Sequence, residues 1–168
     1  MDVHEAISTQ RAVRTFDGRP LPDEALTAIL EAGRRAPSSM NEQRWAFVVC
    51  TDREHLRELA AVGDYAGHIE RAAAAIALVT PVAEQDWRRE SIAFDLGQCA
   101  QSMMLAAWEL GVGSVHAAVY DEELTRRLLG YPDGWRCDYL LSFGYPARGP
   151  TGRGTRKPLE QLVHRERW

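Results

Sequence analysis

The segment from about residue 88 to residue 110 constrains the fold of this chain more than any other. From Met103 to Trp108 every side chain is apolar, so this part of a helix must be buried on more than one side. Because 168 residues are about one domain's worth of chain, the covering elements have to come from a single domain spanning residues 1–168. The apolar positions that recur at the helical spacing of three or four are Ile92, Leu96, Cys99, Met103, Ala107 and Leu110.

Shorter segments supply the elements that cover this helix. Capping residues, prolines and glycines mark the ends of four further helical segments, at residues 2–10, 22–36, 53–61 and 121–129. Apolar runs of strand length occur at residues 45–50, 114–120 and 139–143. Helices and strands follow one another without regular alternation, which predicts an α+β fold with a mixed sheet packed by helices. The candidate helix N-caps are Asp2, the pair Thr51 and Asp52, and Asp121.

The alanine-rich stretch 72–79 is ambiguous. Its alanines favour a helix, whereas Ile76, Leu78 and Val79 suit a buried strand that Pro81 ends. We interpret this stretch as helix first and strand afterwards.

Charge and composition exclude several classes of protein. The chain carries 20 basic and 24 acidic residues, a net charge of −4, which argues against a nucleic-acid-binding protein. The N-terminus has no signal-peptide pattern, and the longest apolar run is far too short to cross a bilayer, so we expect a cytoplasmic protein that makes no membrane contact. The three cysteines form no CxxC pair and lie among apolar residues, as buried thiols do.

Motifs for several kinds of site are missing from the sequence. The five histidines show no HxxxH spacing, which argues against a metal site. No GxSxG motif indicates a nucleophilic serine, and neither GxGxxG nor GxxxxGK[ST] indicates a dinucleotide or Walker site.

Two basic clusters stand out at opposite ends of this acidic chain. One comprises Arg11 and Arg14, and the other comprises Arg153, Arg156 and Lys157. Guanidinium groups bind phosphate oxygens in a forked geometry, so clusters that met in space would form a phosphate site. The alternative is that these cations are simply solvated. The loop 36–43 is similarly open to two interpretations: its small donors and acceptors suit a planar polar heterocycle, or it is an ordinary turn.

The order of these segments resembles the FMN-dependent nitroreductase family along the whole chain. The matching motifs are QRAVRTF at 10–16, APSSMNEQRW at 36–45, residues 95–110, GVGSV at 111–115, LSFGYP at 141–146 and RKPLEQLVH at 156–164. Their joint order and spacing carry the resemblance, and no single one of them does.

The resemblance implies two interlocked subunits, with FMN at the homodimer interface and touched by both chains. Arg11 and Arg14 match N-terminal residues that hold the phosphate, the ribityl chain and the pyrimidine edge of the flavin, and Ala12 lies in the same cofactor-binding segment. Arg156 and Lys157 match the C-terminal basic pair that completes the phosphate contacts. The loop residues expected to reach the flavin of the partner subunit are Pro37, Ser38, Ser39 and Asn41, and the residues expected where backbone approaches the ring are Gly113, Ser114 and Val115.

The chain departs from the family pattern at several positions. Ala12 stands where serine is common, and Ser102 replaces a frequent asparagine. Arg44 replaces a proline before the tryptophan, which predicts a less rigid loop. Residues 60–71 contain no clear counterpart of the Asn and Lys that contact flavin in some members.

Three functions fit this sequence. The first is an NAD(P)H oxidoreductase that passes electrons to nitroaromatics, quinones or similar small molecules, with ping-pong kinetics because nicotinamide and acceptor use one flavin face in turn. Arg14 would then be the catalytic residue that stabilises negative charge near N1 and O2 of the reduced flavin, or would contact only the phosphate or ribityl chain. The second is a flavin-binding protein without turnover, and the third is a helix-mediated dimer without cofactor. Specialised dehydrogenases and dehalogenases of the same fold are a variant of the first.

Overall fold

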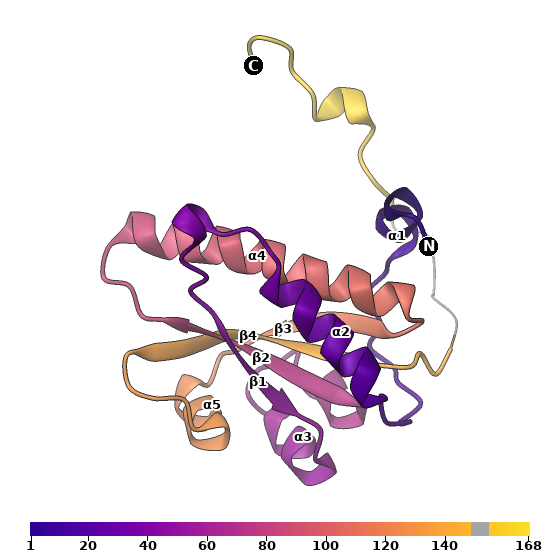
Figure 1. The fold of residues 1–168 in the computed structure, drawn as a ribbon, viewed down its shortest axis with the longest axis vertical. Helices are drawn as coiled ribbons and strands as arrows, with labels where there is room; N and C mark the ends of the chain where they lie inside the picture. Colours follow the sequence, from indigo (N-terminus) through magenta and orange to yellow (C-terminus); the bar gives the residue numbers. More distant parts are fainter. Residues whose placement is uncertain (149–154) are drawn as a thin grey trace.

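The computed structural model describes residues 1–148 and 155–168 (Figure 1). The strands are β1 (Ala46–Cys50), β2 (Ala74–Pro81), β3 (Gly113–Ala118) and β4 (Trp135–Gly144). The helices are α1 (Val3–Thr9), α2 (Asp23–Arg34), α3 (Arg53–Leu59), α4 (Asp86–Glu109) and α5 (Glu122–Leu129). Three short 3₁₀ turns accompany them, η1 (Ser39–Asn41), η2 (Gly67–Arg71) and η3 (Leu159–Gln161).

The four strands form one sheet in the order β1-β2-β4-β3, and every pairing between them is antiparallel. A parallel contribution comes from an isolated bridge between Ala12 and Ser114, at the outer edge of β3. β1 and β3 are therefore the edge strands, and the strands buried in the middle are β2 and β4.

Helices pack on both faces of this sheet (Figure 1), in agreement with the predicted sheet packed by helices, although the strand pairings are antiparallel where a mixed sheet was predicted. α2 and α4 pack on one face, around Ile76, Leu78 and Phe143. α3 and α5 pack on the other face, around Ala75, Ala77 and Leu140. The predicted central helix is confirmed as α4, and five residues of its predicted stripe are buried, whereas the sixth, Leu110, is the C-cap and is 44% exposed.

The capping predictions are also confirmed. The carboxylates of Asp2, Asp52 and Asp121 accept hydrogen bonds from the backbone N–H groups of Glu5, His55 and Leu124, at 2.8–2.9 Å. Each carboxylate satisfies an N–H that the first turn of its helix leaves without a partner.

The interpretation of residues 72–79 as beginning with a helix is wrong. Residues 74–81 form β2, and Ala72, just before it, has an extended conformation. β2 lies between two other strands and beneath helices on both faces, so burial outweighs the helix propensity of its alanines.

The two ends of the chain differ in their contacts with the sheet. Residues 10–17 follow α1 and lie along the ends of β3 and β4, where the Val13 N–H donates to the Ser114 carbonyl and the Asp17 N–H donates to the Tyr145 carbonyl, both at 3.0 Å. Residues 155–168 are exposed throughout, and Figure 1 shows this yellow segment running away from the helices and the sheet.

Candidate functional site

The N-terminal basic segment lies against β3, as the predicted site requires. The backbone bridge from Ala12 to Ser114 brings Arg11 and Arg14 alongside the residues from Gly113 to Val115. Arg14 is exposed and Arg11 is half-buried, so both cations are accessible at this edge of the sheet. The structure therefore brings together two of the predicted groups of site residues.

Glycine at position 113 is explained by packing within this chain. A Cβ atom at Gly113 would lie 2.6 Å from Cγ2 of Val13, so a larger residue would displace the N-terminal segment. Gly113, Ser114 and Val115 are all buried, and the approach of this backbone to a flavin ring stays a prediction. The close approach that glycine allows is an approach of Val13.

The backbone of β3 is open at one point beyond this contact. In antiparallel strands, successive residues turn their N–H and C=O groups alternately toward and away from the partner strand. The Ser114 carbonyl is turned away from β4, so the backbone groups of His116 are turned outward too. Ala118 is covered, because its carbonyl oxygen lies 2.5 Å from where Gly63 would carry a Cβ. Within residues 1–148 and 155–168, no other segment bonds to the outward backbone groups of His116.

His68, from η2, is a site residue that sequence reasoning missed. Its Nδ1 lies 2.8 Å from Oγ of Ser142, which also donates to the carbonyl of Val115 at 3.3 Å. Burial is the main cause that lowers the pKa of His68 to about 4, and electrostatic repulsion from Arg14 and His116 contributes to the same shift. A neutral imidazole thus lies close to the Arg14 guanidinium. The sequence contains no spacing signal that links a residue of η2 to residue 14.

The loop predicted to reach a flavin is fixed to α4. The Ser39 N–H donates to Oδ2 of Asp95 at 2.9 Å, and Asp95 is only 4% exposed. The Gln43 N–H donates to Oγ of Ser38 at 3.0 Å. Three residues without the freedom of glycine take left-handed backbone angles in this loop: Met40, Asn41 and Gln43. Such a conformation persists only where its surroundings hold it.

Arg44 forms an ion pair within this loop, and the lower rigidity expected at this position stays a prediction. Its guanidinium pairs with Glu42 and lowers the pKa of that carboxyl, and Glu42 also lies 3.5 Å from Arg88. Ion pairing thus ties the loop to α4 at the position where the family has proline.

The loop and the N-terminal segment contact opposite ends of α4. Asp95 holds Ser39, whereas Nε1 of Trp108 donates to Oγ1 of Thr9 at 2.9 Å. Thirteen residues of helix separate Asp95 from Trp108, a distance of about 20 Å at 1.5 Å per residue. Figure 1 shows the same separation, with η1 at one end of α4 and α1 at the other. Within one chain, the loop does not join the site at β3.

Within one chain, no hydrogen bond or ion pair among the described residues joins the C-terminal basic pair, Arg156 and Lys157, to Arg11 and Arg14. Arg156 donates only to the neighbouring carbonyl of Thr155, at 3.5 Å, and Lys157 is exposed. Arg153 lies outside the described residues.

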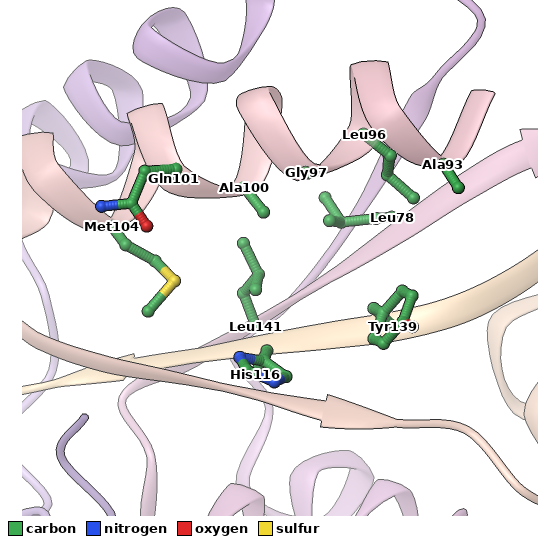
Figure 2. Close-up of a pocket in the computed structure, with 10 residues that line it drawn as sticks. All are labelled: Leu78, Ala93, Leu96, Gly97, Ala100, Gln101, Met104, His116, Tyr139 and Leu141. Carbon is green, nitrogen blue, oxygen red and sulfur yellow. The ribbon is translucent and has the colours of Figure 1, made fainter. Parts of the chain in front are cut away.

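A pocket of about 320 Å³ lies between α4 and the strands β3 and β4 (Figure 2). Leu96 and Met104 line it from the helix, and His116 and Tyr139 line it from the strands. The two rings meet edge to face with their centroids 6.2 Å apart. The pocket gives the site an apolar wall beside the open backbone at His116.

The remaining sequence predictions concern cysteines, metals and membranes. Cys50, Cys99 and Cys137 are free and buried, as predicted, and burial raises the pKa of their thiols to about 11 or 12. In the described residues, no cluster of three or more histidine, cysteine or acidic side chains could hold a metal ion. No helix in the same part of the chain is both long and apolar enough to span a membrane.

Comparison with known proteins identifies one family by both sequence and structure. The sequence matches the model of the nitroreductase family over residues 7–86 and 64–145. A protein of Methanothermobacter thermautotrophicus whose name includes "NAD(P)H nitroreductase" is 34% identical over 176 residues, covering all of this chain and 88% of the relative. The NADPH-flavin oxidoreductase of Vibrio harveyi is 30% identical over 182 residues, covering 98% of this chain and 73% of the relative.

The fold is also shared with solved structures. The NADPH:FMN oxidoreductase from Vibrio harveyi, solved in complex with NAD⁺, superposes with a TM-score of 0.84 at 27% identity, covering 98% of this chain and 77% of the other. The family match spans most of the sequence and the structural agreement spans nearly all of it. This chain belongs to the nitroreductase family.

Proposed function

We propose that this chain is an FMN-dependent oxidoreductase that takes electrons from NADH or NADPH and passes them to small acceptors such as nitroaromatics or quinones. Family membership and the relatives' names support the activity class. The whole chain acts as one FMN-binding domain, in a homodimer whose two sites each draw residues from both subunits.

The observation that carries this proposal is the separation of the loop from the N-terminal segment along α4. The contacts that anchor Ser39 and Thr9 on α4 lie about 20 Å apart along the helix of one chain, which supports an arrangement in which Arg14 and the loop containing Ser39 contact FMN from different subunits. An interlocked dimer solves this geometric problem, since the loop of one chain reaches the β3 edge of the other.

Exposed apolar side chains on α4 and in the C-terminal segment support the same dimer. Phe94 and Trp87 are 72% and 62% exposed on α4, next to Pro37. Leu159 and Leu162 are exposed in the C-terminal segment, where no other part of the described chain buries them. A second copy of the chain can bury both surfaces and place Arg156 and Lys157 near the partner's N-terminal cations.

The residues at the β3 edge fit a flavin. Arg14 supplies an accessible cation, His68 supplies a neutral imidazole, and the outward backbone of His116 supplies one donor and one acceptor. The buried Oγ of Ser114 has no partner in the described residues and is a further group available for hydrogen bonding here. FMN, when bound, supplies the capacity to accept a hydride and to release electrons to an acceptor.

This chain's own residues bind the cofactor and adjust its charge. Arg11, Arg14, Arg156 and Lys157 hold the phosphate and the polar edge of the ring, and Arg14 stabilises negative charge that develops on that edge. His68 remains neutral near pH 7, so it adds no second cation beside Arg14. The pocket beside His116 provides an apolar wall for a planar ring.

NAD(P)H and the acceptor use the same site in turn, because the sequence encodes no separate nucleotide-binding motif. The expected kinetics are ping-pong, with parallel lines in double-reciprocal plots at several acceptor concentrations. Intersecting lines would contradict a single shared site. We place the enzyme in the cytoplasm, where its three free thiols stay reduced.

The test that separates this function from flavin storage is turnover. Protein loaded with FMN should consume NADH or NADPH steadily when menadione is supplied. A protein that only stores flavin would bind FMN and leave it oxidised in excess reductant, and a purely structural dimer would not bind FMN.

A further inference from the structure

A second pocket, which is polar, lies where the N-terminal segment, α3 and η2 meet. Its volume is about 540 Å³, and three arginines line it: Arg53, Arg57 and Arg71. None of the residues that line this pocket belongs to the candidate flavin site. The pocket is therefore a separate feature of the molecule.

Arg53 is fixed in place by backbone carbonyls. Its Nη1 donates to the carbonyls of Glu70 and Ala72 at 3.1 and 2.9 Å, and its Nη2 lies 3.5 Å from the carbonyl of Gly18. These bonds leave Nε–H and one Nη2–H of the guanidinium for another acceptor. The wall of the pocket thus carries a positioned, charged donor.

The other two arginines have no acidic partner in the described part of the chain. Arg57 follows Arg53 by four residues, so both project from the same side of α3, and Arg71 joins them from η2. Neither Arg57 nor Arg71 forms an ion pair or a side-chain hydrogen bond with any described residue. Like charges at this spacing destabilise a helix unless an anion neutralises them.

The acidic residues of the pocket do not neutralise the three arginines. Asp17 already accepts from Nε of Arg19 at 2.7 Å and from the Arg19 N–H at 2.9 Å, and these bonds lower its pKa. Glu70 is the remaining carboxylate on the pocket wall. The sequence of residues 149–154 contains no acidic residue that could neutralise the remaining positive charge. The described residues that line the pocket carry three positive and two negative charges, and Arg19, which pairs with Asp17, raises the local net charge to +2.

We propose that this pocket binds the phosphate group of a small molecule. Three guanidinium groups around one cavity match a doubly charged tetrahedral oxyanion, because each can donate two hydrogen bonds in a fork. A cavity of about 540 Å³ holds more than the phosphate alone, so the ligand is a phosphorylated compound. Its source is either the 2′-phosphate of NADPH or a separate phosphorylated metabolite.

The test uses FMN-saturated protein, so that added phosphate does not compete for the flavin site. Inorganic phosphate is titrated calorimetrically at constant ionic strength set with chloride. We expect saturable binding of one phosphate per chain, weakened at least tenfold in the double variant R57A/R71A. The control R127A removes an exposed arginine from α5 and should bind phosphate like the parent. Absence of saturable binding, or equal affinity in R57A/R71A, would overturn the proposal.

A second measurement identifies the source of the phosphate. If the 2′-phosphate of NADPH binds here, R57A/R71A raises KM for NADPH and leaves KM for NADH unchanged. If a separate metabolite binds, both KM values stay at the parent's level while phosphate binding is lost. Because phosphate binding is measured without turnover, this site can fail while the proposed oxidoreductase function stands, and the reverse also holds.

Discussion

Single residues set the charge of the site at β3, and His68 shows how. Its imidazole is half-buried, and its Nδ1 shares a hydrogen bond with Oγ of Ser142. The positive charge of Arg14 also acts on this imidazole. The burial and the neighbouring charge both disfavour a second positive charge at this position. The site therefore keeps the cation of Arg14 without a competing imidazolium.

The lowered pKa of His68 predicts a pH dependence of stability. The unfolded chain binds a proton at His68 below about pH 6.5, whereas the folded chain does so only near pH 4. The contribution is therefore fully present above pH 6.5 and is lost as the pH falls toward 4. Urea unfolding at several pH values should show a shallower rise of the unfolding free energy across this window in H68Q than in the parent. H164Q, in the exposed C-terminal segment, should keep the parent's slope, and an equal slope in H68Q would refute the assignment.

Arg156 carries the prediction for the C-terminal cations. If it holds the FMN phosphate in the dimer, R156A should weaken FMN affinity by about 1.5–3 kcal/mol, the value of a hydrogen bond to a charged group. Fluorescence titration of FMN-free protein measures this affinity. R165A, nine residues further along the same segment, is the matched control and should bind FMN normally. FMN affinity in R156A equal to that of the control would remove Arg156 from the site.

The loop 37–44 and α4 act as one unit at the scale of elements. Asp95 is the buried contact between them, and D95A leaves the Ser39 N–H without its acceptor. The free energy of unfolding should fall by about 1–3 kcal/mol, the cost of an unsatisfied buried donor. D95N keeps an acceptor oxygen and should lose less.

The control for this prediction lies on the same helix. Asp86 is exposed and pairs only with Arg89 among the described residues, so D86A should change the free energy of unfolding little. Urea denaturation of the three variants tests the order. If D95A were as stable as D86A, Asp95 would not hold the loop.

The elements were predictable from sequence where local chemistry decides them. Asp52 and Asp121 cap their helices because a carboxylate can reach the free N–H groups of the first turn, and both ends follow from neighbouring residues alone. Ala74 and Ala75 were misinterpreted because their strand conformation comes from β4, about 65 residues later in the chain. Propensity carries no information about such a partner.

For the candidate site too, some features could be predicted from local sequence and others could not. The family resemblance assigned Arg11, Arg14 and residues 113–115 to one flavin site, and the structure brings these segments together. The positions of His68 and of the open backbone at His116 depend on the strand order and on the turn at Gly63, which local sequence does not encode. The ion pairing at Arg44 depends on Glu42 and Arg88, which the loop sequence alone does not bring together.

The whole molecule is expected to be a homodimer through the exposed face of α4. F94E places a charge on an apolar side chain that is 72% exposed. We expect this variant to sediment as a monomer and to lose FMN, because each site then lacks the partner's loop. Y65E is the matched control, since Tyr65 is 76% exposed and lies outside α4. A dimeric F94E that retains FMN would place the interface elsewhere.

The central claim is that this chain uses bound FMN to carry electrons from NAD(P)H to a small acceptor. The most direct test records the visible spectrum of the FMN-loaded protein under anaerobic conditions, after NADPH or NADH is added and again after menadione follows. Our account predicts that the flavin absorbance bleaches with the reductant and returns with the acceptor, over repeated cycles. Bound flavin that stays oxidised with both nucleotides would contradict it.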